Sequence, residues 1–207
     1  MRRSVCAFFV LLAGAGVASV ASAQETGTPV FKAPYRAFQS HEFGANLSFP
    51  EGPADFGLEG FYTYGYNRFD IGLRGGIVSY DAPLGDNDTK IALGASFRAR
   101  VVEASQSFPL DGALTLGIGT QFGEGSDVAW LPIGISLGRR LQLEGSRTSF
   151  VPYVHPVLVP RFGGGDDEVE FALGLGVDIR FSETIDLRVS AGIGEIEGVA
   201  LGLAFVR

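Results

Sequence analysis

Apolar and polar side chains alternate with a period of two along most of the chain. The clearest case spans residues 169–181, where one parity holds only large apolar side chains: Val169, Phe171, Leu173, Leu175, Val177, Ile179 and Phe181. The other parity holds alanine, glycine and single charges. This period is typical of a β-strand with one apolar and one polar face, and it differs from the period of a helix.

The alternation recurs along the chain and predicts ten antiparallel strands. Their expected ranges are 42–50, 55–65, 68–80, 89–102, 111–122, 127–139, 148–161, 168–182, 184–194 and 197–206. Eight strands is the alternative count. Beyond residue 23, no stretch of the sequence has the ~20 continuous apolar residues of a membrane helix. We therefore expect an all-β fold whose strands follow one another up and down.

The make-up of the two strand faces indicates which of them is inside. The polar faces mix the smallest residues with isolated charges, as in Ala172, Gly174 and Asp178. A narrow barrel lumen requires such residues, whereas the solvent face of a soluble protein carries many long polar side chains. Closure also satisfies the backbone at every strand edge, which lipid demands. We predict a closed transmembrane β-barrel; a soluble barrel or sandwich is the alternative.

Composition excludes several other classes of protein. The 207 residues include 30 glycines, and charged residues make up only 19%. Disordered chains are more charged and less apolar, and glycine is costly inside helices. The formal net charge of −7 argues against a nucleic-acid partner, because phosphate binding needs a basic face.

The start of the chain has the features of a secretory signal. Arg2 and Arg3 supply positive charge, residues 6–20 are apolar, and residues 21–23 fit the small-x-small cleavage rule. Cleavage there would leave a mature chain without cysteine, since Cys6 is the only one. The expected organisation is a signal peptide at 1–23, an N-terminal periplasmic extension at 24–40 and a barrel domain at 41–207.

Acidic residues gather in alternate connections of the predicted barrel. With an even number of strands, the first, third, fifth, seventh and ninth connections lie at the end opposite the termini. These connections hold twelve of the 23 acids: Glu51, Asp55, Asp81, Asp86, Asp88, Glu124, Asp127, Asp166, Asp167, Glu168, Glu195 and Glu197. The connections at the end that carries the termini are mixed in charge. This sorting supports the predicted strand count.

With its signal sequence, its alternating strands and a last strand that reaches the C-terminus, the chain resembles the small outer-membrane β-barrel proteins of Gram-negative bacteria. Residues 171–177, Phe-Ala-Leu-Gly-Leu-Gly-Val, show the alternation most plainly. The resemblance implies eight to ten strands, a place in the bacterial outer membrane, and contact with its lipid and its assembly machinery. Members usually end in an aromatic residue that assists assembly; here Phe205 is third from the end and Arg207 is last.

The inward faces carry a balanced set of charges. We predict a lumen charge network of six acids and six bases: Glu42, Glu59, Asp70, Glu170, Asp178, Asp186, Arg74, Lys90, Arg98, Arg100, Arg180 and Arg188. A short turn joins the strands that carry Asp178, Arg180, Asp186 and Arg188, which favours pairing across these strands. The network either fills the lumen as a salt-bridged plug or lines an ion path. Buried charges of this kind must be paired or hydrated.

No catalytic, cofactor or metal site is predicted. The two histidines are His41 and His155, and Ser149 lies roughly 20 Å along its strand from His155, too far for a hydrogen bond. The acids at 86–88 and 166–168 lack EF-hand spacing. We expect a non-enzymatic barrel with a largely filled lumen and a structural or surface-interaction role whose ligand is unknown. A narrow porin-like channel and a membrane-embedded hydrolase are the alternatives.

Two further patterns concern single strands. Pro152, Pro156 and Pro160 share one parity in the strand expected at 148–161, so the missing N–H donors weaken one seam and leave the other intact. This predicts either a weak seam or local bulges. Tyr62, Tyr64, Tyr66 and Trp130 fit a belt of aromatic rings at the lipid headgroups, and Tyr153 is a further candidate; ordinary packing is the alternative for each of them.

Overall fold

The computed structural model describes residues 25–34, 40–80, 88–123, 127–164 and 168–207. The strands in these ranges are β1 (His41–Pro50), β2 (Ala54–Tyr66), β3 (Phe69–Tyr80), β4 (Asp88–Val102), β5 (Asp111–Phe122), β6 (Val128–Trp130), β7 (Ile133–Gly138), β8 (Leu141–Gln142), β9 (Ser149–Gly163), β10 (Glu168–Arg180), β11 (Ile185–Gly194) and β12 (Gly198–Val206). The described residues contain no helix with the length and apolarity needed to cross a membrane. The predicted signal peptide lies outside these ranges.

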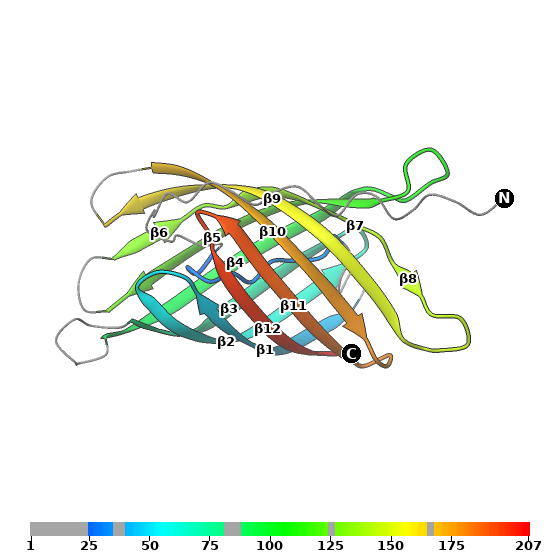
Figure 1. The fold of residues 1–207 in the computed structure, drawn as a ribbon, viewed down its shortest axis with the longest axis horizontal. Helices are drawn as coiled ribbons and strands as arrows, with labels where there is room; N and C mark the ends of the chain where they lie inside the picture. Colours follow the sequence, from blue (N-terminus) through cyan, green and yellow to red (C-terminus); the bar gives the residue numbers. More distant parts are fainter. Residues whose placement is uncertain (1–24, 35–39, 81–87, 124–126, 165–167) are drawn as a thin grey trace.

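The strands form one closed antiparallel barrel in which, apart from the short segments β6, β7 and β8, each strand pairs with its neighbours in the chain (Figure 1). β1 closes the barrel against β12, with Glu42 opposite Val206 and Pro50 opposite Gly198. The short segments β6 and β7 lie between β5 and β9, and β8 pairs with β9. Together these three segments occupy one strand position. The described chain therefore occupies ten strand positions. Ten strands is confirmed, and the eight-stranded alternative is wrong.

The large apolar side chains point outward from this barrel. Leu73 is 60% exposed and Ile118 is 58% exposed, although each lies in the middle of a long strand. Inward residues of the same strands are buried and mostly small or polar, such as Gly72 and Thr115. A soluble barrel would bury its apolar faces, so the outer surface fits lipid. The fold is a transmembrane β-barrel.

A charge on the lipid face is expected to be costly only at mid-membrane depth. Leu73→Arg should lower the free energy of unfolding by about 2–4 kcal/mol, because Leu73 is at the centre of β3. Val169→Arg, at the start of β10, should lower it by about 0–1 kcal/mol. Urea unfolding in lipid vesicles measures both values. Equal losses for the two variants would contradict the membrane position assigned to β3.

The proline-rich strand β9 has one continuous seam and one interrupted seam. Its pairing with β10 runs unbroken from Arg161 opposite Glu168 to Ser149 opposite Arg180. On its other side, the ladder is split among β6, β7 and β8. The carbonyls of Pro152 and Pro160 accept hydrogen bonds from this interrupted side. Another residue at either position would also direct its N–H to this side, but proline has no N–H to donate. The difference between the two seams is as the parity of the prolines predicted.

The aromatic residues expected at the lipid headgroups divide into two groups. Tyr62, Tyr64 and Tyr66 are exposed near one end of the barrel, at the close of β2. Trp130 and Tyr153 were wrongly placed, since they are 5% and 4% exposed and face the lumen. Both belong to an apolar cluster inside the barrel, described below.

Candidate functional site

A non-strand segment of the chain occupies the lumen. Residues 25–34, here called the plug segment, precede β1 and run inside the barrel as the dark-blue trace in Figure 1. Thr26 and Thr28 are 0% exposed, Phe31 is 2% exposed and Ala33 is 1% exposed. The sequence predicted an N-terminal periplasmic extension at residues 24–40; in the structure, residues 25–34 of this stretch lie inside the barrel.

Side chains of the wall bind the backbone of the plug segment from several strands. Gln121 Nε2 donates to the carbonyl of Thr26 (2.7 Å), and Ser190 Oγ donates to that of Pro29 (2.8 Å). Tyr153 OH donates to the carbonyl of Phe31 (3.1 Å), and Ser136 Oγ donates to that of Lys32 (2.6 Å). A segment outside the sheet has no ladder to satisfy these carbonyls, so the wall side chains do so instead. The donors come from β5, β7, β9 and β11, and they hold the plug segment from several sides.

One side of the lumen is apolar and receives Phe31. The ring lies edge-on to His155, with 5.9 Å between the ring centroids. Gly174 and Gly192 make room for it: a Cβ added at Gly174 would overlap the Phe31 ring, and one at Gly192 would contact it. The buried cluster around the ring consists of Ala33, Trp130, Val151, Tyr153, Val157, Val159, Ala172 and Ile196.

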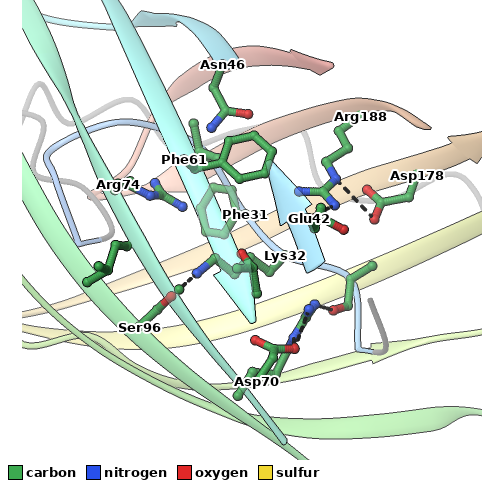
Figure 2. Close-up of a pocket in the computed structure, with 16 residues that line it drawn as sticks. Phe31, Lys32, Glu42, Asn46, Phe61, Asp70, Arg74, Ser96, Asp178 and Arg188 are labelled. Carbon is green, nitrogen blue, oxygen red and sulfur yellow. Dashed lines mark hydrogen bonds and ion pairs between the residues drawn. The ribbon is translucent and has the colours of Figure 1, made fainter. Parts of the chain in front are cut away.

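Another part of the lumen is charged and receives Glu25 and Lys32. Lys32 Nζ lies 3.0 Å from Glu25 Oε1 and also donates to Ser96 Oγ. Glu25 Oε2 lies 3.3 Å from Arg74 Nε, and Arg74 Nη1 lies 4.0 Å from Glu59 Oε2. Figure 2 shows Phe31 and Lys32 between Arg74 on one side and Arg188 on the other. The plug segment thus meets each wall with side chains of matching polarity.

The structure places all six predicted acids inside the barrel. Each of them is between 0% and 6% exposed: Glu42, Glu59, Asp70, Glu170, Asp178 and Asp186. Of the six predicted bases, Arg74 and Arg98 are buried. The side chains of Arg180 and Arg188 are 26% and 16% exposed. The ion pairs of these residues join neighbouring strands to one another and to the plug segment.

The cluster nearest the end of β10 shows the expected pairing across strands. Asp178 stands opposite Arg188 and Arg180 opposite Asp186 in the register of β10 and β11. Arg180 Nε lies 3.2 Å from Asp186 Oδ1, and Arg188 Nε lies 3.7 Å from Asp178 Oδ2. Arg188 also pairs with Glu42 of β1, so this cluster joins three strands around the closure of the barrel.

A second cluster ties the wall to the plug segment. Arg98 of β4 donates from Nε (2.8 Å) to Asp70 Oδ2, and its Nη2 is 2.7 Å from the same oxygen. The Nη1 of Arg98 donates to the carbonyl of Ala33. The guanidinium therefore balances a buried carboxylate and binds the plug segment at once.

The remaining two predicted bases, Lys90 and Arg100, also lie on β4. Lys90 Nζ stands 5.6 Å from the centre of the Tyr80 ring. Arg100 pairs with the half-exposed Glu103 at 3.0 Å, beyond the end of β4. Their parity correctly places them on the inward-facing register of β4, but their positions along the strand set their partners.

Sequence reasoning missed three charged residues of the lumen. Glu25 and Lys32 lie in a segment without periodic pattern, so no signal placed them inside. Arg161 lies 3.5 Å from Glu170 Oε1 and 3.7 Å from Glu168. Arg161 has the parity of the inward residues of β9, such as His155, and that parity was the available signal.

Two small cavities lie beside the plug segment. The cavity between it and the charged wall has a volume of about 20 Å³ and is lined by Lys32, Asp70, Arg74, Arg98 and Arg188, among others. A cavity of this size holds about one water molecule. A second cavity of about 10 Å³ lies next to Thr115 and His155.

The histidines and serine weighed for catalysis have other partners. His155 is 0% exposed, and its Nε2 lies 2.7 Å from Thr115 Oγ1. Ser149 Oγ accepts from Arg140 Nε at 3.3 Å. His41 lies at the start of β1, where its Nδ1 is 2.6 Å from the hydroxyl of Tyr62. Among the described residues, no group of histidine, cysteine or acidic side chains has the arrangement of a metal site.

Comparison with known proteins gives a likeness of fold. No protein-family model and no curated protein matches the sequence. The structure is similar to the β domain of the Bordetella autotransporter BrkA, with a TM-score of 0.50 and 13% identity over 81% of this chain and 98% of that one. It is also similar to a barrel described under de novo design of transmembrane β-barrels, with a TM-score of 0.42 and 15% identity over 83% and 98% of the two chains.

Proposed function

We propose that the protein is a non-enzymatic outer-membrane β-barrel whose lumen is closed by its own plug segment and whose role is structural or in surface interaction. One observation carries the proposal: residues 25–34 are buried inside the barrel and bound by wall side chains from several strands. The cavity of about 20 Å³ beside them is too small for a solute larger than water.

The ends of the barrel differ in charge, and the acidic end is the one we assign to surface contacts. Among the described residues, Glu51, Asp55, Asp127, Glu168 and Glu197 are exposed at the end opposite the termini. The other predicted loop acids at this end include five outside the described ranges: Asp81, Asp86, Glu124, Asp166 and Asp167. An acidic rim of this kind attracts cationic groups and repels anions.

The outer-membrane position rests on the apolar outer surface and the strand-built fold. Partners expected from that position are outer-membrane lipid and the machinery that assembles outer-membrane barrels. The aromatic residue nearest the C-terminus is Phe205, which stacks on Phe43 across the closing seam with ring centroids 5.6 Å apart. This outward-facing pair is where we expect the assembly machinery to recognise the last strand.

Conductance in a planar bilayer tests the closed lumen. The refolded mature chain should insert stably and show no steady single-channel conductance, because residues 25–34 lie in the lumen among its buried ion pairs. Protection of the inserted strands from added protease provides the control that the protein has entered the bilayer. Steady, reproducible conductance would instead support the narrow porin-like channel, for which the charged side of the lumen is the favourable observation.

A further inference from the structure

We propose that the plug segment is releasable and that Arg74 exchanges one carboxylate partner for another when it leaves. In the closed lumen, Arg74 Nε lies 3.3 Å from Glu25 of the plug segment, and Arg74 Nη1 lies 4.0 Å from Glu59 of the wall. Glu59 is thus already placed beside the same guanidinium. This inference rests on the proposed closed barrel and adds a way of opening it.

The plug segment can leave without stranding a net charge in the lumen. Glu25 and Lys32 are the charged residues of 25–34, and they pair with each other at 3.0 Å. Removing a neutral unit leaves the balance of charges in the wall unchanged. A buried charge that lost its partner would be costly, so this neutrality favours release as one piece.

The wall groups left behind also have new partners within reach. Glu59 accepts a hydrogen bond from Thr28 Oγ1 (2.7 Å) in the closed lumen. When Thr28 and Glu25 depart, Glu59 and Arg74 lose one partner each and can pair with one another from neighbouring strands. Each arrangement therefore satisfies Arg74 with a carboxylate, Glu25 in one and Glu59 in the other.

The form of the plug segment is consistent with release. Residues 25–34 contain turns and one isolated bridge, and their contacts with the wall are mostly single hydrogen bonds rather than a strand ladder. Phe31 opposes release, because its ring would leave the apolar wall for water. The closed arrangement is therefore the dominant one. Opening is infrequent, and the charged contacts determine how often it occurs.

Two glutamate-to-glutamine changes separate this mechanism from a merely structural role. Glu25→Gln weakens the closed arrangement, in which Lys32 and Arg74 lose their carboxylate, while the released arrangement keeps the Arg74–Glu59 pair. In the closed lumen, Glu59→Gln keeps the shorter Arg74–Glu25 pair and an amide oxygen that can accept from Thr28, and it removes only the 4.0 Å contact between Arg74 and Glu59. After release, the same change deprives Arg74 of its carboxylate partner. The two changes should therefore move the release equilibrium in opposite directions.

The experiment measures how often the plug segment leaves. A Cys6→Ser, Val30→Cys chain carries one thiol in the plug segment, at a position that is 7% exposed in the closed lumen. The full chain, refolded in lipid vesicles, is treated with a water-soluble maleimide. Glu25→Gln should raise the labelling rate at least about tenfold and Glu59→Gln should lower it, since uncompensated buried charges are strongly unfavourable. Glu170→Gln, a buried carboxylate that pairs with Arg161 instead, should leave the rate unchanged.

The outcomes distinguish this inference from the proposed function. Opposite shifts for Glu25→Gln and Glu59→Gln support the exchange of partners. Shifts in the same direction, or no shift in either variant, overturn it while leaving the closed barrel intact. If Glu25→Gln fails to refold, an absence of slowing in Glu59→Gln alone overturns the inference. Steady conductance of the unaltered chain contradicts the proposed function whatever the labelling rates are.

Discussion

Arg98→Met is expected to lower the free energy of unfolding of the barrel by about 3–5 kcal/mol, the usual cost of removing one partner from a buried ion pair. Asp70 would stay in the lumen, 1% exposed, without the guanidinium that now meets its Oδ2 from two nitrogens. The carbonyl of Ala33 would lose its donor as well. The loss should exceed that of any substitution at an exposed ion pair.

Urea unfolding in lipid vesicles measures this change. The matched control is Arg68→Met, whose side chain is 63% exposed and pairs with Glu103, and it should change the free energy by less than ~1 kcal/mol. The double variant Arg98→Met, Asp70→Leu should regain most of the loss, because an apolar pair needs no counter-charge. A single variant within error of the unaltered protein would mean that Asp70 is hydrated or otherwise compensated.

Phe31→Ala is the second large effect. Truncating a buried phenylalanine costs about 3–5 kcal/mol through lost apolar contact and the cavity left behind. Phe31 is 2% exposed and anchors the plug segment against the apolar wall. The cost falls on the docked state of the plug segment, so labelling of the Val30→Cys thiol should speed up even if the barrel itself unfolds at a similar urea concentration.

A second substitution checks the position of the ring. Gly174→Ala should destabilise the docked plug segment by about 1–3 kcal/mol, since its methyl group would overlap Phe31. In the Phe31→Ala background the same change should cost much less. Gly60→Ala, whose added Cβ would lie no closer than 3.9 Å to its neighbours, serves as the control. Equal costs of Gly174→Ala in both backgrounds would contradict the contact.

The strands and their inward charges could be predicted because period two is a local pattern. The parity of Asp178 and Arg180 on one strand, and of Asp186 and Arg188 on the next, followed from the sequence, and a short turn fixed their register. The sixth strand position was predicted as continuous over 127–139. In the structure it is split, because Pro132 cannot donate to a ladder and separates β6 from β7.

The plug segment could not be predicted in this way. Residues 25–34 have neither alternation nor helical period, and their position depends on contacts with residues far along the chain. Gln121 binds the Thr26 carbonyl across 95 residues of sequence. Trp130 and Tyr153 were misplaced for a related reason: a large amphipathic ring fits a headgroup belt or a lumen wall equally well. The inward parity that Tyr153 shares with His155 decides between the two.

The closing seam has a consequence for how the chain reaches its final state. His41 and Arg207 exchange backbone hydrogen bonds of 2.8 and 2.7 Å, so the first strand pairs with the last residue of the sequence. Ser190, which donates to the Pro29 carbonyl, is 161 residues away from it. Contacts this distant require large loops to close before they form, which makes them slow. The N-terminal segment must therefore wait for the final strands to be made before it has walls to bind.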